Sequence, residues 1–234
     1  MEIQIRDRLI EEILNGTYGW GEKLPSENRL SEEYQVPRIT VRKVLVTLED
    51  MGYIYSRQGQ GRFLRERQEK IPLNLTGEVS FTDKLKESGF DLETSTVGNR
   101  EISPSPKMRR VLQAGTEELI CRIERLRIVN GKPIAIHISY LKESLFPDIG
   151  ERADQIESLF AYFREKGYTG FCSSKTNMSI SLPTMDEQNL LACPPLVPLL
   201  VMEADTKCSD TGQVIQYTRI LYRSDVFQYE VNSL

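Results

Sequence analysis

The sequence has 234 residues, of which 39% are hydrophobic and 27% charged, proportions that indicate a globular protein with one large domain or two of ordinary size. A formal net charge of −4 argues against a protein that coats nucleic acid without regard to its sequence. Four separated cysteines without a C-x-x-C pair, a single histidine, and the absence of a signal-peptide pattern or a long apolar run favour a cytoplasmic protein with reduced thiols and no metal site.

The N-terminal region predicts three helices. Residues 3–14 carry apolar side chains mostly at helical spacing. Ser26 is a good N-cap for a second, short helix, and a tight turn is expected at residues 35–37. A third helix starts at Arg38 and closes at Gly52, a residue suited to the left-handed conformation. Its buried stripe consists of Val41, Val44, Leu45 and Leu48.

Positive charge gathers on the outer side of the third helix, near its N-terminus. Arg38, Arg42 and Lys43 lie there with no acidic residue between Val36 and Leu48. The N-terminal end of a helix already carries a positive partial charge, so a cation there gains nothing from its own helix. A bound polyanion, in contrast, would stabilise these cations.

A hairpin and a linker complete the N-terminal region. Two strand-like runs flank a turn at residues 58–61. Helix, helix, turn, helix and hairpin in this order predict a winged helix-turn-helix over residues 1–65. Residues 66–76 lack clear periodicity and are interpreted as a linker.

Residues 77–234 predict an α+β domain with an antiparallel sheet. Short helices, each ended by a glycine, are expected within 81–90 and 105–115, and a longer helix within 154–168. The clearest hairpin turns at Asn130-Gly131, the favoured type I′ pair, and a second hairpin turns at residues 210–212. Helices inserted between antiparallel hairpins make an α+β fold.

Motifs in both halves resemble one family. LPSENRLSEEYQVPRITVRKVLVTLEDMGYIYSRQGQGRFL resembles the winged helix of GntR-family bacterial transcription regulators. RIERLRIVNGKPIAIHISYL, SLFPDIG and YTRILYRSDVF resemble the UTRA effector domain of the HutC branch, whose fold is similar to chorismate lyase. Together these motifs span nearly the whole chain. One departure is Pro37, which stands where the family commonly has serine; proline can occupy the first position of a helix but supplies no hydroxyl cap.

The third helix is expected to read DNA. A helix fits the major groove, where Arg38 and Arg42 could bond guanine O6 and N7 or clamp phosphates, and Ile39 could contact a thymine methyl. The resemblance adds Asn28 and the wing glycines. The alternative is that these cations form a solvated, charged helix face without a role in DNA binding. The candidate DNA-binding residues are Ser26, Asn28, Arg38, Ile39, Thr40, Arg42, Lys43, Gly59 and Gly61.

In the second domain, Arg125 and Arg127 alternate along a predicted strand and therefore point to one face. Turning two arginines inward costs desolvation energy unless an anion pairs with them. Ion pairs with Glu124 or Glu143 are an alternative. The resemblance implies that the pair, together with a helix start at Ser80 to Thr82, holds the phosphate of a sugar. The candidate effector-binding residues are Phe81, Thr82, Arg125, Arg127, His137, Gln216 and Tyr222.

Three of these residues bear on the identity of the effector. Relatives that bind amino-sugars carry glutamates at the positions held here by His137 and Gln216, so the resemblance favours a neutral phosphorylated sugar over a cationic one. Tyr222 matches an aromatic residue that closes over the ligand, although it could equally be a core tyrosine.

The function expected from these observations is a bacterial transcription repressor that binds a palindromic operator as a homodimer and is released by a small anionic effector. No catalytic pair, cofactor or metal is expected. The alternative is a chorismate-lyase-like enzyme acting on a small anionic substrate, which would have no need of the N-terminal helix-turn-helix. A constitutive architectural DNA binder is disfavoured by the large second domain and the net acidity.

Overall fold

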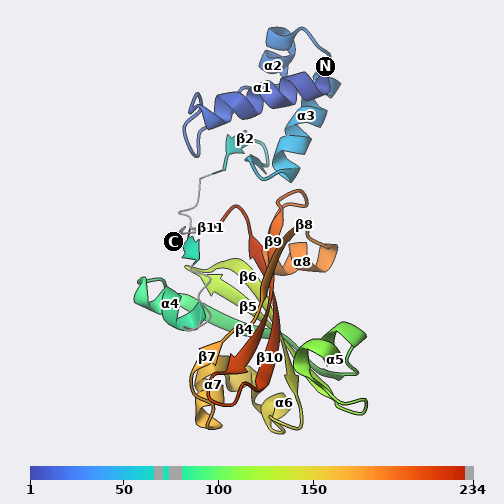
Figure 1. The fold of residues 1–234 in the computed structure, drawn as a ribbon. Coiled ribbons are helices and arrows are strands. Elements are labelled where there is room, and N and C mark those ends of the chain that lie inside the picture. The colour runs from blue at the N-terminus through green and yellow to red at the C-terminus, as the bar shows by residue number, and fades with distance from the viewer. Residues whose placement is uncertain (66–70, 74–80, 230–234) are drawn as a thin grey trace, which may run out of the picture. The chain divides into compact units, whose positions relative to one another are not determined.

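The computed structural model describes residues 1–65, 71–73 and 81–229. The chain forms two compact units (Figure 1). The first comprises residues 1–71 together with 182–198, and the second comprises residues 72–181 together with 199–234. The predicted linker over 66–76 falls mostly outside the described residues, although Ile71–Leu73 forms a short strand, β3, that pairs with β11, Phe227–Tyr229.

Three helices form the body of the first unit: α1 (Glu2–Leu14), α2 (Glu27–Tyr34) and α3 (Arg38–Asp50). Gln35 closes α2 in the left-handed conformation, with φ 52°, which makes the tight turn into α3. The apolar stripe predicted for α3 is buried, and it packs with side chains of α1 and α2 into one core. The core residues include Ile5, Leu9, Ile13, Leu24, Leu30, Val41, Val44, Leu45, Leu48, Ile54 and Leu64.

The helix α3 starts at Arg38, as the sequence predicted. Pro37 is the N-cap of this helix, with φ −58° and ψ 143°, and not its first helical residue. Proline has no side-chain oxygen, so no side chain caps the free N–H groups of the first turn. The helix therefore begins with its first backbone donors available to an outside acceptor.

A hairpin wing follows α3. Strands β1 (Ile54–Arg57) and β2 (Gly61–Leu64) pair antiparallel, with Arg57 opposite Gly61. Lys23 forms an isolated antiparallel β-bridge with Phe63, which joins the segment before α2 to the wing. Three helices and this wing are the predicted winged helix-turn-helix.

The first unit also contains α8, Met185–Leu191, which begins with a capping box formed by Thr184 and Glu187. After α8, the Leu196 N–H donates to the Asp50 carbonyl at the end of α3 over 2.9 Å. The sequence alone gave no indication that this segment packs with the first unit.

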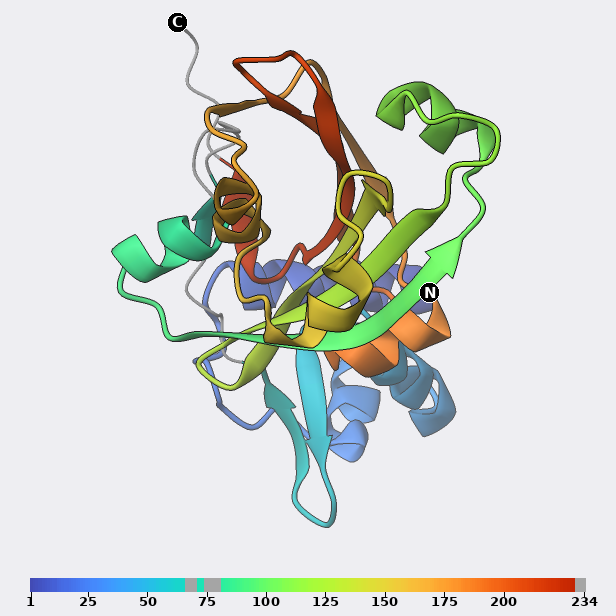
Figure 2. The ribbon, with the colours of Figure 1, turned by 90° about the horizontal axis from the view of Figure 1, so that it is seen from below.

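The second unit is built on an antiparallel sheet in the order β4-β5-β6-β10-β9-β7, with β8 also paired to β9. Figure 2 shows that the sheet is strongly curved. Asn130 and Gly131 both have positive φ at the β5–β6 turn, as the type I′ prediction requires. The strands are β4 (Leu92–Ile102), β5 (Ile120–Val129), β6 (Lys132–Lys142), β7 (Phe171–Cys172), β8 (Thr176–Ser181), β9 (Leu199–Cys208) and β10 (Val214–Arg223).

Short helices accompany this sheet: α4 (Phe81–Glu87), α5 (Pro106–Leu112), α6 (Ile149–Arg152) and α7 (Leu159–Glu165), with a 3-10 turn at Ala153–Gln155. Two details correct the sequence prediction. Gln113, and not a glycine, takes the left-handed position that closes α5. The helix expected within 154–168 starts only at Leu159, because Ser158 caps it by accepting the Ala161 N–H.

The core of the second unit lies under α6 and α7. Phe146, Tyr162, Phe163 and Phe171 pack there with aliphatic side chains from β5, β6 and β10. Among the described residues, no helix combines the length and the apolar character needed to cross a bilayer.

Candidate functional site

The outer face of α3 carries the predicted DNA-reading side chains. Arg38, Ile39, Arg42 and Lys43 are all exposed, and Thr40 is half-buried. Ile39 is 58% exposed, an unusual position for a large apolar side chain on a small domain. The Lys43 Nζ lies 3.4 Å from a Glu2 carboxylate oxygen.

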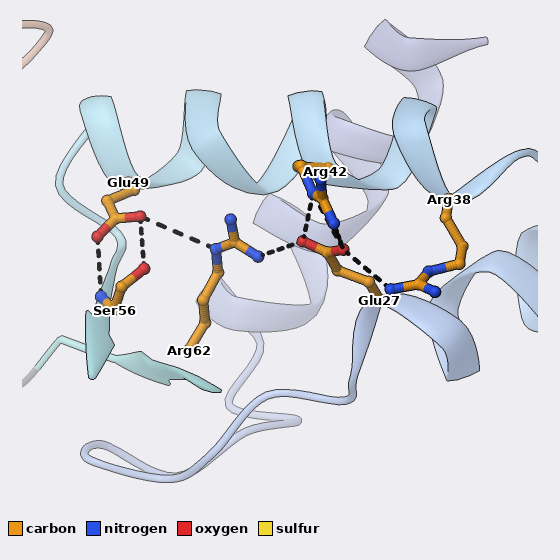
Figure 3. Close-up of polar contacts among 6 residues, drawn as sticks. All are labelled: Glu27, Arg38, Arg42, Glu49, Ser56 and Arg62. Atoms are coloured by element: carbon orange, nitrogen blue, oxygen red, sulfur yellow. Dashed lines mark hydrogen bonds and ion pairs between the residues drawn. The ribbon is translucent and has the colours of Figure 1, made fainter. Parts of the chain in front are cut away.

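Arg42 is not merely solvated, because it bonds Glu27 (Figure 3). The Arg42 Nε lies 3.1 and 3.2 Å from the two Glu27 oxygens, and Nη2 donates to Oε2 over 2.9 Å. Arg62 of β2 donates from Nη1 to the other oxygen, Oε1, also over 2.9 Å. Arg38 approaches Oε2 more loosely, at 3.8 Å. One carboxylate therefore faces three arginines.

A second carboxylate extends this network into the wing. Glu49 of α3 accepts two bonds of 2.8 Å from Ser56 of β1, one from its N–H and one from its hydroxyl. The same Glu49 lies 3.8 Å from the Arg62 Nε (Figure 3). Side chains of α2, α3 and both wing strands are thus tied together through Glu27, Arg62 and Glu49.

The arginines change the acidity of Glu27. Hydrogen bonds from Arg42 and Arg62 lower the pKa of Glu27 to about 2, against the opposing effect of partial burial. Because the folded-state pKa is below the unfolded one, this carboxylate stabilises the fold above pH about 4.5, and the contribution is lost as the pH falls towards 2. At neutral pH Glu27 is ionised and the three arginines outweigh its charge.

The remaining candidate DNA-binding residues lie at the start of α2 and at the tip of the wing. Ser26 caps α2, where its hydroxyl accepts the Arg29 N–H over 3.3 Å, and Asn28 is exposed in the first turn. Gly59 and Gly61 have φ of 72° and 110°, which side chains rarely adopt, so glycine shapes the tip of the wing.

The arginine pair of the second unit lies on β5. Arg125 and Arg127 are only 3% and 2% exposed. Their Nη1 atoms point to one acceptor, the Glu157 carbonyl, at 3.5 and 3.4 Å, and Arg127 also donates to the Thr94 hydroxyl. Within the described part of the chain, neither arginine has a carboxylate partner and neither Nε has an acceptor.

The alternative of ion pairs with Glu124 or Glu143 is therefore wrong: Glu124 binds Arg122 on the other face of β5, and no ion pair joins Glu143 to either arginine in the described residues. The unpaired burial has an electrostatic consequence. Burial and the charge of Arg127 lower the pKa of Arg125 well below its ordinary value, and burial lowers the pKa of Arg127 to about 10. Two cations are buried here at an electrostatic cost that an anion would remove.

An aromatic group stands beside the pair. The Phe81 ring lies 4.6 Å from the His137 ring and 6.0 Å from the Tyr222 ring, between centroids, and the Arg127 guanidinium lies 5.8 Å from the Phe81 centroid. His137 is buried, and its Nε2 has no hydrogen-bond partner within the described residues. Burial, Arg127 and Arg125 lower its pKa well below the ordinary value, so this histidine is neutral at physiological pH.

Gln216 and Thr82 complete the predicted set. Gln216 donates to the Ser139 hydroxyl over 2.8 Å, on the same face of β10 as Tyr222. Thr82 is buried in α4. Ser80 lies outside the described residues, and α4 has only seven residues, so the case for an anion site rests on the arginines and not on a helix terminus.

A cavity of about 300 Å³ lies elsewhere in the second unit, beside α5, β8 and β9. Its Lys107 already donates to Glu203 over 2.7 Å, and Tyr217 donates to the same carboxylate over 2.8 Å. Tyr217 also points to the opposite face of β10 from Gln216 and Tyr222. Because this lysine has a carboxylate partner and the buried arginines have none in the described part of the chain, the arginine cluster is the stronger candidate for anion binding.

Several participants were missed by sequence reasoning. Glu27 and Arg62 are part of the network around Arg42, and Thr94, Ser139 and the Glu157 carbonyl lie around the buried arginines and Gln216. Glu27 could have been found from the sequence. It directly follows the N-cap serine of the second helix, and the helix after that one begins with arginines. The Glu157 carbonyl could not, because backbone groups leave no residue pattern.

Known families match both units. The profile described as "Bacterial regulatory proteins, gntR family" matches residues 2–64, and the UTRA domain profile matches residues 87–228. These matched families are regulators of transcription and not enzymes, so the chorismate-lyase-like enzyme alternative is set aside.

Individual proteins align over nearly the full chain. The HTH-type transcriptional repressor NagR of Bacillus subtilis is 26% identical over 226 residues, which cover 97% of this chain and 91% of that protein. The mannosyl-D-glycerate transport/metabolism system repressor MngR of Escherichia coli is also 26% identical, with 97% and 92% covered. The crystal structure of PhnF from Mycobacterium smegmatis shares the fold, with a TM-score of 0.63 at 22% identity and coverage of 98% and 99%.

Proposed function

The chain belongs to the GntR family of bacterial transcription regulators and carries a UTRA domain, and on that basis we propose that it is a cytoplasmic repressor released from operator DNA by a small anionic effector. Two similar proteins, NagR and MngR, are named as repressors, and MngR is named for a sugar-derivative transport and metabolism system. The observation that carries the effector proposal is the buried arginine pair, which has no carboxylate partner among the residues that the structure describes.

The first unit supplies the DNA-reading surface. The uncapped N-terminus of α3 offers free N–H groups to a phosphate oxygen, beside Thr40. Arg38 and Arg42 face the groove as base or phosphate donors, Ile39 is placed for a thymine methyl, and Lys43 for the backbone. Asn28 and the glycine-shaped wing tip flank this helix on either side.

A homodimer would place two such surfaces on a palindromic operator. The sheet edge formed by β8 supports this assembly. Among the described residues β8 pairs only with β9, it contains no charged residue, and Ile180 is 75% exposed. Natural edge strands are normally protected by charges or proline. An antiparallel pair of β8 strands about a two-fold axis at Ser179 would set Met178 against Ile180 of the second copy, twice.

The effector would bind at Arg125 and Arg127. A phosphate dianion would accept their unused donors and remove the cost of burying two unpaired cations. The neighbouring Phe81, His137 and Tyr222 rings and Gln216 could then pack against and hydrogen-bond a sugar. No carboxylate of this set could pair with an ammonium group, so we propose a neutral phosphorylated sugar and not an amino-sugar phosphate.

The test of DNA reading begins with selection of duplexes from a random library by the full-length protein. Arg42→Ala should weaken binding to the selected duplex by about 1–3 kcal/mol and relax specificity at one base pair. Lys43→Ala is the matched control. This variant should weaken binding to all duplex sequences by the same factor and reduce the salt dependence of binding by about one counterion. Failure of the wild-type protein to enrich any sequence would overturn the proposed function.

A further inference from the structure

We propose that Glu27 is a specificity-determining residue, which holds one edge of the Arg42 guanidinium so that the opposite edge is fixed for reading guanine. The proposal rests on the proposed function, because it concerns how the same DNA-reading surface achieves its selectivity. Glu27 itself would touch no base and acts through Arg42.

The geometry of the Arg42–Glu27 pair supports this role (Figure 3). A guanidinium group offers five N–H donors in a planar fork. Glu27 accepts from Nε and from Nη2, which occupies one edge of the plane. Nη1 has no partner among the described residues, so the far edge keeps a pair of donors. Guanine O6 and N7 accept two parallel bonds from such an edge.

Glu27 is itself held firmly, as a positioning residue must be. It is the first residue of α2, directly after the Ser26 cap, where a negative charge is favoured by the helix dipole. Its side chain is 17% exposed, whereas that of Arg42 is 54% exposed. Arg62, 18% exposed and also near Glu49, binds its second oxygen. The carboxylate thus has a fixed place before Arg42 binds it.

Arg42 is not the sole cation that stabilises the ionised Glu27 among the described residues. Arg62 is the more buried partner and already supplies a positive charge at 2.9 Å. The bond to Arg42 stabilises the ionised acid and also restricts the exposed arginine. A free arginine side chain samples many rotamers and would bind any phosphate in reach, whereas a restrained one is directed at a base. The three arginines outweigh the single carboxylate, so the surface stays attractive to DNA.

The experiment compares Glu27→Gln with the wild-type protein. Three duplexes are used: the one selected from the random library, the same duplex with the guanine read by Arg42 replaced, and a random sequence. The guanine is identified as the position whose selectivity Arg42→Ala abolishes. Glu32→Gln, which removes an exposed charge from the same helix, is the matched control. Thermal denaturation of each variant reports on folding.

Glu27→Gln should reduce discrimination between the first two duplexes by at least about fivefold, while affinity for the random duplex stays equal or rises because a negative charge has gone. Glu32→Gln should keep full discrimination. Glu27→Asp, which keeps the charge but shortens the reach, should show an intermediate loss and provides the test if Glu27→Gln fails to fold.

Two results would overturn the proposal. One is unchanged discrimination in folded Glu27→Gln although Arg42→Ala abolishes it; the proposed function would then stand and only the role of Glu27 would fall. The other is an equal loss of affinity for all three duplexes, accompanied by a lower melting temperature. Glu27 would then support the fold alone.

Discussion

Each of the two proposed sites depends on arginine side chains, which are exposed to solvent at one site and buried at the other. Arg42 is exposed and paired with Glu27, whereas Arg125 is buried and has no acidic partner within the described residues. An exposed pair contributes little to stability and can serve recognition. A buried, unpaired cation destabilises the fold and is retained where a ligand needs it.

A stability measurement follows from this difference. Arg125→Met should leave the effector-free protein equally stable or raise its free energy of unfolding by about 1–3 kcal/mol, because a buried charge is replaced by an apolar chain of similar length. Arg122→Met is the contrasting variant and should destabilise, since it leaves Glu124 unpaired. Both are compared with the wild type by denaturant unfolding. A clear destabilisation by Arg125→Met would mean that Arg125 supports the fold through contacts other than a bound anion.

At the scale of elements, the residue at the start of α3 affects both the stability of this helix and the proposed DNA contacts. Serine at an N-cap accepts an N–H of the first turn through its hydroxyl, whereas Pro37 offers only its carbonyl, which accepts the Thr40 N–H over 2.9 Å. The backbone of Pro37 has the extended conformation that an N-cap serine also adopts. The proline therefore leaves the helix without a side-chain cap, and its first donors remain open to a phosphate.

Pro37→Ser should therefore stabilise the first unit relative to Pro37→Ala by about 1 kcal/mol, the usual difference between a capped and an uncapped helix. Comparing two substitutions cancels the effect of losing proline on the unfolded chain. The readout is the difference in midpoint between their thermal transitions. Identical midpoints would show that the new hydroxyl does not reach the first turn of α3.

The elements also show what sequence could and could not predict. The stripe of α3, the Asn130-Gly131 hairpin and the wing turn were predicted because local patterns determine them. The long strand β4 was missed, since its polar and apolar residues follow no strong periodicity in the sequence. The packing of α8 with the first unit is a long-range contact without a local pattern.

In the candidate sites too, features set by a local pattern were predicted and long-range contacts were not. The arginines were found because charge on one helix face or one strand face is a periodic feature. Glu27 comes fifteen residues before Arg42 in the chain, and the contact depends on how α2 packs on α3. The lack of an acidic partner for Arg125 could also be learned only from the structure, since Glu124 is its neighbour in sequence but points to the other face.

At the scale of the whole molecule, the proposed function requires assembly into a dimer and a response to the effector. Ile180→Lys would place a charge on the exposed β8 edge and should convert a dimer to monomers, while the melting temperature stays close to that of the wild type because Ile180 packs against little within one chain. Sedimentation at micromolar concentration measures this. Asn177→Lys, one position off the apolar face, controls for charge alone and should weaken the dimer less. Dimers that persist in Ile180→Lys would exclude β8 as the interface.

An effector response requires two arrangements of the protein, one that binds DNA and one that does not, and a ligand that binds them with different affinities. The difference in binding free energy is typically about 1–3 kcal/mol. The chain passes between the two units at residues 71–72, 181–182 and 198–199. Strand β9 pairs with β10, which carries Gln216 and Tyr222, and β8 pairs with β9. The segment that packs at the end of α3 lies in the chain between β8 and β9.

The most direct test of a repressor released by a phosphorylated sugar is to titrate the complex of the full-length protein and its library-selected duplex with hexose 6-phosphates and with the same sugars lacking phosphate, while DNA release is followed by fluorescence anisotropy. We predict that at least one phosphorylated sugar releases the duplex, that its dephosphorylated form does not, and that Arg125→Met binds the duplex normally but no longer responds. Equal potency of the two forms, or a full response in Arg125→Met, would contradict the assignment of Arg125 and Arg127 to phosphate binding.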